Sequence, residues 1–162
     1  YTLALDGAEW AALADGLAQR ARLLEAVLAD LYGPQALLAE GLLPPALVLG
    51  SPHFLRAARG GAARRPLLHL YAADLVRGAD GAWHVLQDRT GLASGLGLGL
   101  ENRRMLSAAM PEAFRAAAPR SITPFFELWA EALAGLAPQR RDDPAIALLS
   151  PGTLDPHWYE HV

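Results

Sequence analysis

Two extended runs joined by a short polar turn stand near the middle of the chain: Leu67-Leu-His-Leu-Tyr-Ala-Ala-Asp-Leu-Val76, then Arg77-Gly-Ala-Asp-Gly-Ala82, then Trp83-His-Val-Leu-Gln-Asp-Arg89. Both runs are rich in aliphatic and aromatic residues, which favour strands. The Asp-Gly pair between them favours a tight turn. The sequence therefore predicts an antiparallel β-hairpin.

The alternation of side chains along this hairpin sorts its polar residues between two faces. With residues 78–81 as the turn, we expect Asp74 to lie opposite Val85. Gln87 and Arg89 then share the face of Asp74, and Asp88 points to the other side. A register shift of one residue would instead bring Asp88 onto the face of Asp74.

A glycine-rich loop follows the hairpin, over residues 90–99, and we expect a helix from Leu100 to about Ala109. Carboxylate oxygens on the hairpin suit Mg²⁺, which prefers carboxylates together with substrate phosphates. Backbone N–H groups of the glycine loop, near a helix start, suit phosphates. The alternative interpretation is that Asp74, Gln87 and Arg89 form the wet face of an ordinary hairpin.

The rest of the chain reads mainly as helices. Asp6 is expected to cap a long helix, with Glu9 completing a capping-box pattern, and Gly33-Pro34 to end that helix. Residues 46–49 and 145–149 read as short strands, and Asp155-Pro156 as the start of a last helix. Further helices are expected over 35–40, 111–117 and from Pro124, with the basic residues Arg56, Arg59, Arg64 and Arg65 in a loop over 51–66.

Composition excludes several classes of protein. A net charge of −3 does not fit a nucleic-acid binder, and the absence of cysteine excludes disulfides and thiol catalysis. The chain has no lysine, so it contains neither a P-loop nor a Schiff-base lysine. No apolar run is long enough to cross a bilayer. We expect a soluble, cytoplasmic protein with no membrane or nucleic-acid partner.

The segment His157-Trp-Tyr-Glu-His161 matches the H-x-x-E-H pattern of inverted zinc peptidases. Two histidines four residues apart on a helix could bind zinc, with Glu160 as general base. Pro156, however, places the motif in the first turn of its helix, and a five-residue motif also arises by chance. A zinc peptidase is therefore an alternative function that rests on this one segment.

Taken together, several segments resemble the circularly permuted ATP-grasp family, in particular its glutathionylspermidine synthase-like branch. The resemblance covers nearly the whole chain in order and spacing. The segments are Arg20-Ala-Arg-Leu-Leu-Glu-Ala-Val-Leu-Ala-Asp-Leu-Tyr-Gly33, Glu40-Gly-Leu-Leu-Pro-Pro45, Leu70-Tyr-Ala-Ala-Asp-Leu75, Gln87-Asp-Arg-Thr90, Ser94-Gly95, Leu100-Glu-Asn-Arg103, Leu148-Leu-Ser-Pro-Gly152 and Tyr159-Glu-His161.

The resemblance implies an α+β fold with mixed helices and a central antiparallel hairpin, forming part of a permuted ATP-grasp domain. It implies ATP and Mg²⁺ as cofactors, and ligation of a carboxylate to an amine. Residues 1–144 would be the metal and phosphate side, and 145–162 the truncated start of a following α/β unit. The remainder of the polypeptide would complete the site, so the fragment alone is expected to be inactive.

The family pattern maps its metal-ligand Asp, Glu and Asn positions onto Asp74, Gln87 and Arg89. The last two depart from the pattern, because Gln87 has no anionic oxygen and Arg89 would repel a divalent ion. Arg89 could instead contact a phosphate, and Asp88 could become a ligand if the register shifts. The site expected from the resemblance is catalytic Arg89 and Arg103, cofactor-binding Ser94, Gly95, Gly97 and Asn102, and metal-binding Asp74, Gln87 and Asp88. The departures leave a degenerate, non-catalytic ATP-grasp module, binding nucleotide or a protein partner, as the alternative.

Overall fold

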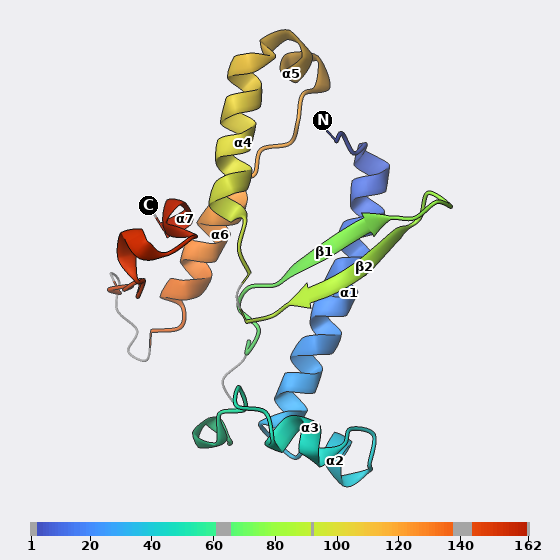
Figure 1. Ribbon diagram of the computed structural model, residues 1–162, viewed down its shortest axis with the longest axis vertical. Coiled ribbons are helices and arrows are strands. Elements are labelled where there is room, and N and C mark those ends of the chain that lie inside the picture. The colour runs from blue at the N-terminus through green and yellow to red at the C-terminus, as the bar shows by residue number, and fades with distance from the viewer. Residues whose placement is uncertain (1–2, 61–65, 92, 138–143, 162) are drawn as a thin grey trace. The chain divides into compact units, whose positions relative to one another are not determined.

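The computed structural model describes residues 3–60, 66–91, 93–137 and 144–161 and contains two compact units, Tyr1–Ala93 and Ser94–Val162 (Figure 1). The first unit combines helices with a two-stranded antiparallel sheet, and in the described part of the second unit the regular structure is helical. The expected α+β class, with mixed helices around one hairpin, is therefore confirmed. The expected boundary near residue 144 stays a prediction.

The first unit begins with the long helix α1, Gly7–Leu31. Its predicted start is confirmed, because the Asp6 carboxylate accepts a hydrogen bond of 2.8 Å from the Glu9 backbone N–H. The Glu9 side chain does not complete a capping box but accepts hydrogen bonds from Arg77 and Trp83 of the hairpin. The helix start is thus also a docking point for the hairpin.

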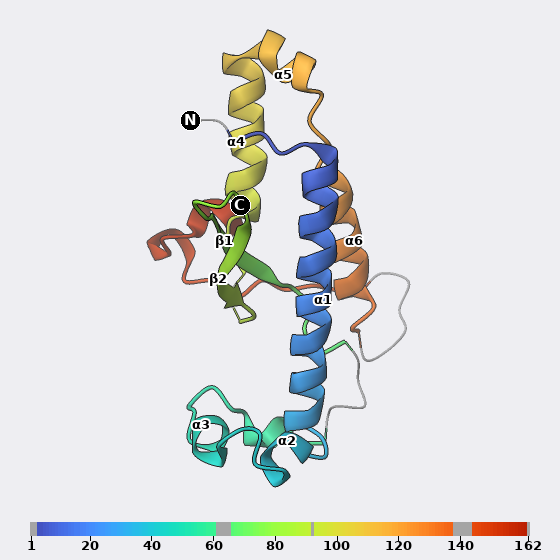
Figure 2. The same cartoon turned by 90° about the vertical axis from the view of Figure 1, so that its right-hand side faces the viewer.

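Three short elements gather at the C-terminal end of α1: α2 (Ala36–Ala39), α3 (Pro45–Leu49) and the 3₁₀ turn η1 (Arg56–Ala58) (Figure 2). The strand expected over 46–49 is wrong. Pro45 occupies the first turn of α3, where its missing N–H has no cost, and Gly50 N–H donates to the Ala46 carbonyl. Of the basic loop, Arg56 donates to the Leu49 carbonyl, and Arg64 and Arg65 lie outside the described residues.

The hairpin consists of β1 (Ala72–Arg77) and β2 (Trp83–Arg89). Asp74 pairs with Gln87 and not with Val85, which pairs with Leu75, so the expected register is wrong. Leu86 is left without a partner and forms a bulge. The observed register departs from the expected one by two residues, because the turn is one residue longer, with Arg77 paired to Trp83, and the bulge adds one more. Each one-residue shift reverses the faces, so the two shifts together leave the expected faces unchanged.

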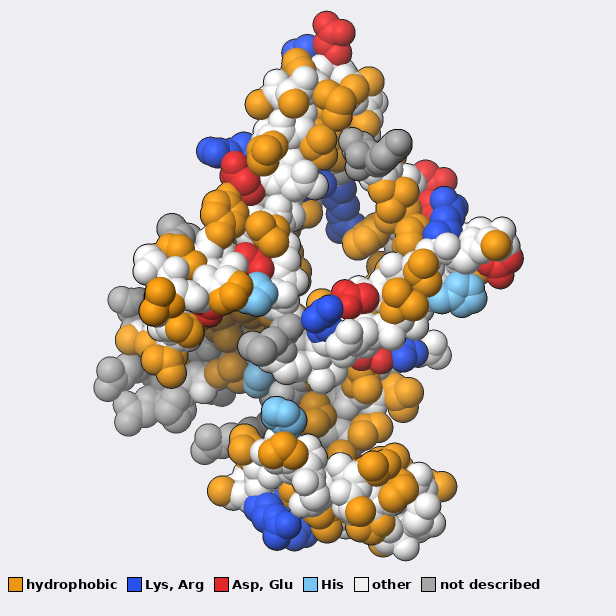
Figure 3. Space-filling view, in the orientation of Figure 1, with side chains coloured by type: hydrophobic (Ala, Val, Ile, Leu, Met, Phe, Trp, Pro, Cys, Tyr) orange, Lys and Arg blue, Asp and Glu red, His pale blue; other side chains and the backbone are white. Residues whose placement is uncertain are grey.

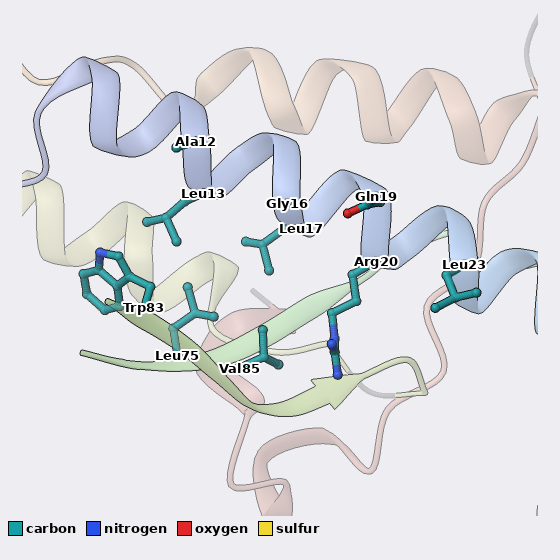
Figure 4. A pocket seen from close by; sticks show the side chains of 10 residues that line it. All are labelled: Ala12, Leu13, Gly16, Leu17, Gln19, Arg20, Leu23, Leu75, Trp83 and Val85. Carbon is teal, nitrogen blue, oxygen red and sulfur yellow. The ribbon is translucent and has the colours of Figure 1, made fainter. Parts of the chain in front are cut away.

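One face of the hairpin packs against α1 across an open groove of about 640 Å³ (Figure 4). Leu13 and Leu17 of the helix line this groove, opposite Leu75 and Val85 of the strands. Arg77 stacks over Trp83, with its guanidinium carbon 5.5 Å from the ring centre. The other face of the hairpin, with Asp74 on it, points away from α1.

The second unit contains α4 (Leu96–Ala109), α5 (Pro111–Ala117), α6 (Thr123–Ala134), the 3₁₀ turn η3 (Gly152–Leu154) and α7 (Trp158–His161). In both views α5 follows the far end of α4, and α7 lies at its start (Figures 1 and 2). The helices expected at 111–117 and from Pro124 are confirmed. The helix expected from Leu100 begins earlier, at Leu96, so it includes part of the glycine-rich segment.

Residues 145–149 do not form the buried strand that was expected. Leu148 is 69% exposed and Leu149 is 99% exposed, and no described strand lies beside this segment to pair with it. The last helix begins at Trp158 and not directly after Pro156. The Asp155 carboxylate nevertheless accepts a hydrogen bond of 2.8 Å from the His157 backbone N–H.

Apolar surface is abundant. Ala29, which is 5% exposed, is the only buried apolar residue among those described. Apolar side chains cover much of the surface of α4 and of the α2–α3 segment (Figure 3). In the described residues no helix combines the length and the hydropathy that a membrane crossing needs.

Candidate functional site

The outer face of the hairpin carries three of the predicted site residues. Asp74 and Gln87 face each other across the strands, and Arg89 lies diagonally beside Asp74. The guanidinium of Arg89 binds the Asp74 carboxylate through Nε at 2.9 Å and Nη2 at 2.6 Å. The prediction that Asp74, Gln87 and Arg89 share a face is confirmed, although the register from which it followed is wrong.

The Asp74–Arg89 pair is partly open to solvent, with 42% and 40% of the two side chains exposed. The guanidinium hydrogen bonds hold the pKa of Asp74 below its usual value. A pair this exposed contributes little to stability and can exchange partners readily. Its arginine fork matches a phosphate as well as a carboxylate.

Asp88 points to the opposite face, toward α1. The Arg20 guanidinium donates two hydrogen bonds to its carboxylate, from Nε at 2.6 Å and Nη2 at 2.7 Å, and the Tyr71 hydroxyl donates a third at 2.7 Å. Hydrogen bonds from Arg20 and Tyr71 lower the pKa of Asp88. Burial, followed by the hydrogen bond to Asp88, raises the pKa of Tyr71 to about 12.

These residues do not fit a divalent-ion site as they are arranged. Asp74 and Asp88 lie on opposite faces of the hairpin, and an arginine already binds each of them. Gln87 supplies only a neutral oxygen. Across the part of the chain that the structure describes, no group of three or more histidine, aspartate or glutamate side chains could hold a metal.

The start of α4 carries the next set of predicted residues. Gly95 is the N-cap, with a φ of 102° that favours glycine, and it has no side chain to cap the helix. The Glu160 carboxylate takes that role, since its Oε2 accepts hydrogen bonds from the backbone N–H groups of Gly95 at 2.6 Å and Gly97 at 3.2 Å. A side-chain anion thus occupies the N–H groups expected to bind a phosphate.

Gly97 has a steric reason to be glycine. A Cβ atom there would lie 3.0 Å from the Glu160 Cα, whereas a Cβ at Gly99 would meet nothing within 4 Å. The backbone of α7 therefore approaches the first turn of α4 closely. The same contact explains the role of Glu160. Its carboxylate caps the start of α4 and is not arranged as part of a zinc site.

The remaining predicted residues lie on or beside α4. Ser94 is exposed directly before the helix. Asn102 and Arg103 lie about two turns into α4 and not at its start, because the helix begins at Leu96. Asn102 lines a shallow depression of about 410 Å³, and the Arg103 guanidinium donates to the Arg120 carbonyl.

Sequence reasoning missed the partners of the candidate residues. Arg20 and Tyr71 were not singled out as site residues, although both lie in segments that carry the family resemblance. Glu160 was noticed as part of a metal motif and of a segment that carries the family resemblance, and not as the cap of a helix. Partners separated by 65 or 68 residues leave no local signal in a single sequence.

Comparisons with known proteins give the family. The model of the family described as circularly permuted ATP-grasp type 2 matches residues 3–162. An uncharacterized protein of Mycobacterium tuberculosis is 42% identical over 151 residues, which cover 93% of this chain and 17% of that protein. An uncharacterized Synechocystis protein is 33% identical over 157 residues, which cover 95% of this chain and 32% of that protein.

A third relative, a protein of Frankia casuarinae provisionally named glutamate–cysteine ligase 2-2, is 36% identical over 154 residues, or 94% of this chain and 18% of that protein. The chain thus spans between about a sixth and a third of the length of these curated relatives. The family match extends over almost all of the sequence. The chain belongs to the circularly permuted ATP-grasp type 2 family.

Proposed function

We propose that the complete polypeptide is an ATP- and magnesium-dependent carboxylate–amine ligase of the ATP-grasp type, to which this chain contributes the phosphate side of the site. Family membership supports the fold and the class of reaction. Two Frankia relatives with provisional glutamate–cysteine ligase names support a small-molecule or peptide carboxylate as substrate. The glutathionylspermidine synthase-like resemblance supports an amine as its partner. ATP supplies the phosphoryl group that activates the carboxylate.

The observation that carries the proposal is the outer face of the hairpin. It holds Asp74, Gln87 and Arg89 together on the side away from α1, with the ion pair partly open to solvent. In our proposal the Arg89 fork leaves Asp74 for a nucleotide phosphate, a change that costs little for an exposed pair. Since the hairpin does not fit a metal site, magnesium belongs to the proposal as a counter-ion of the phosphates.

The start of α4, in the second unit, is a separate candidate for phosphate binding. Gly95 and Gly97 offer backbone N–H groups at a helix N-terminus, which favours negative charge. Ser94 lies directly before them, and we assign Asn102 and Arg103 to the same helix as supporting residues. Binding of a phosphate to these N–H groups requires the Glu160 carboxylate to give them up.

Calorimetric titration of Mg-ATP tests the proposal, with the complete polypeptide and the 162-residue chain run side by side. We expect magnesium-dependent binding to the complete polypeptide only, because the chain spans a minor part of its relatives. Arg89→Gln should weaken this binding about tenfold or more, the loss of a charge-assisted hydrogen-bond pair. Arg104→Gln is the matched control, since Arg104 is a paired arginine on α4, bound to Glu101.

A second candidate function is a non-catalytic module that binds nucleotide or a protein partner. The ion pair between Asp74 and Arg89 and the neutral side chain of Gln87 favour this candidate, because they leave the outer face without a free carboxylate. In that case Mg-ATP or a partner would bind to the complete polypeptide without ATP hydrolysis or amide formation for any acid and amine supplied. Turnover with any such pair of substrates would eliminate this candidate.

A further inference from the structure

The bulge at Leu86 decides which side chains of β2 lie on the outer face. Trp83 and Val85 face α1, so strict alternation would place Gln87 on the α1 side and Asp88 outside. The extra residue reverses this order beyond Leu86. Asp88 then faces α1, and Gln87 joins Asp74 on the outer face.

Residues from three segments hold this bulged arrangement. The Arg20 fork from α1 and the hydroxyl of Tyr71, directly before β1, both bind the Asp88 carboxylate at 2.6–2.7 Å. If β2 slipped by one residue, Asp88 would turn away from α1 and lose all three hydrogen bonds. Only the bulged register keeps Asp88 bound.

A second link between α1 and the hairpin gives a contrast within the same unit. Glu9 accepts hydrogen bonds from Arg77 at 2.7 Å and from Trp83 at 2.8 Å. Arg77 and Trp83 pair with each other at the turn end, on the other side of the bulge from Asp88. Losing this link would loosen the helix without changing the register beyond Leu86.

We propose that Arg20, Tyr71 and Asp88 are positioning residues that hold the bulged register and thereby place Gln87 and Arg89 beside Asp74. Their role in the register stands on the hairpin geometry alone, and their effect on ligand binding rests on the proposed function. Asp88 therefore acts through the outer face and not as a ligand on it.

Cross-strand disulfide formation in the complete polypeptide reports the register directly. Ala72 pairs with Arg89, so an Ala72→Cys, Arg89→Cys variant brings two thiols into reach only in the bulged register. The linked peptide is quantified by mass spectrometry after mild oxidation. We expect its rate of formation to fall at least fivefold when Asp88→Asn is added, and to keep its original value when Glu9→Gln is added.

Conservative changes separate a specific loss of the bulged register from a general destabilisation of the fold. Asp88→Glu keeps the charge and should retain most of the cross-linking, whereas Arg20→Lys keeps the charge but loses the fork and should reduce it. Equal cross-linking with and without Asp88→Asn would overturn the proposal, as would an equal loss with Glu9→Gln. If Asp88→Asn does not fold, Tyr71→Phe replaces it. An unchanged rate of disulfide formation in that variant also counts against the proposed role of these residues.

The effect on ligand binding is measured separately, because the cross-link forms without nucleotide. With Arg89 intact, Asp88→Asn should weaken Mg-ATP binding to the complete polypeptide, and Glu9→Gln should not. Slower cross-linking together with unchanged Mg-ATP affinity would support the role of these residues in the register. It would also remove the outer face from the proposed nucleotide site.

Discussion

The hairpin and the start of α4 both hold their candidate ligand-binding groups against an internal partner, but the partners differ in kind. On the hairpin, carboxylates of Asp74 and Asp88 are bound by arginine side chains. At α4, backbone N–H groups of Gly95 and Gly97 are bound by the carboxylate of Glu160. A polar cluster of this kind is available to a ligand only when its internal partner is weakly held.

By this criterion the outer face of the hairpin is the more available of the two. The Asp74–Arg89 pair is about 40% exposed, so solvent replaces either partner easily. The Glu160 carboxylate is more enclosed, and its second oxygen, Oε1, is buried with no hydrogen-bond partner in the described residues. A ligand at α4 must displace a partly buried carboxylate that holds two N–H groups, which costs more than separating an exposed pair.

The largest expected effect comes from Asp74→Asn in the complete polypeptide. If Asp74 positions the Arg89 guanidinium at a ligase site before phosphate binds, the turnover number should fall roughly 100-fold, because the electrostatic group at the reacting centre is no longer oriented. The fold should persist, because the pair is exposed. Turnover is followed by phosphate release, and folding by circular dichroism. Wild-type turnover in this variant would remove Asp74 from the site and show that the exposed pair on the hairpin does not take part in ligand binding.

Glu160→Gln should affect stability more than Asp74→Asn does. The variant keeps the shape but loses the charge that stabilises the helix start, at a cost of about 1–2 kcal/mol in the free energy of unfolding. Denaturant unfolding of the complete polypeptide, followed by a probe in the Ser94–Val162 unit, measures this cost. An unchanged unfolding midpoint would mean that Glu160 binds the N–H groups of α4 no more firmly than Arg89 binds Asp74.

Two glycine variants give a finer test of the same contact. Gly97→Ala should destabilise the α4–α7 contact, because the added Cβ meets the Glu160 backbone at 3.0 Å. Gly99→Ala, two residues on in the same helix with open space around it, should stabilise the helix by about 0.5–1 kcal/mol. The two shifts in unfolding midpoint should therefore have opposite signs. A stabilising shift from Gly97→Ala as large as that from Gly99→Ala would show that α7 does not approach Gly97 closely.

The smallest effect is the titration of Tyr71. Its pKa is about 12 and the ordinary value is 10.0, so the folded protein holds this proton more tightly than the unfolded chain does. The associated stability is complete below pH 10 and is lost as the pH rises through 12. The ultraviolet difference titration between wild type and Tyr71→Phe isolates this phenol. A midpoint near pH 10 would show that Tyr71 is not enclosed with Asp88.

Local sequence signals predicted the elements that depend on neighbouring residues. The Asp6 cap, the hairpin turn at Asp80-Gly81 and the proline-started helix at Pro111 all follow from contacts within a few positions. Short apolar runs were less informative. Residues 46–49 became a helix after a proline, and residues 145–149 became neither strand nor helix, because a strand needs a partner that the run itself does not specify.

The sequence by itself determined the class of fold, the presence of the hairpin and the family resemblance, since these depend on local pattern and on the order of motifs. Only the tertiary structure decided the register and the partners. The bulge at Leu86 assigned Asp88 to α1 and Gln87 to the outer face, and Glu160 came to cap a helix that starts 64 residues earlier than itself at Leu96. The physical reason is that carboxylates pair with whichever donors the fold brings within about 3 Å, and a single sequence does not record those distances.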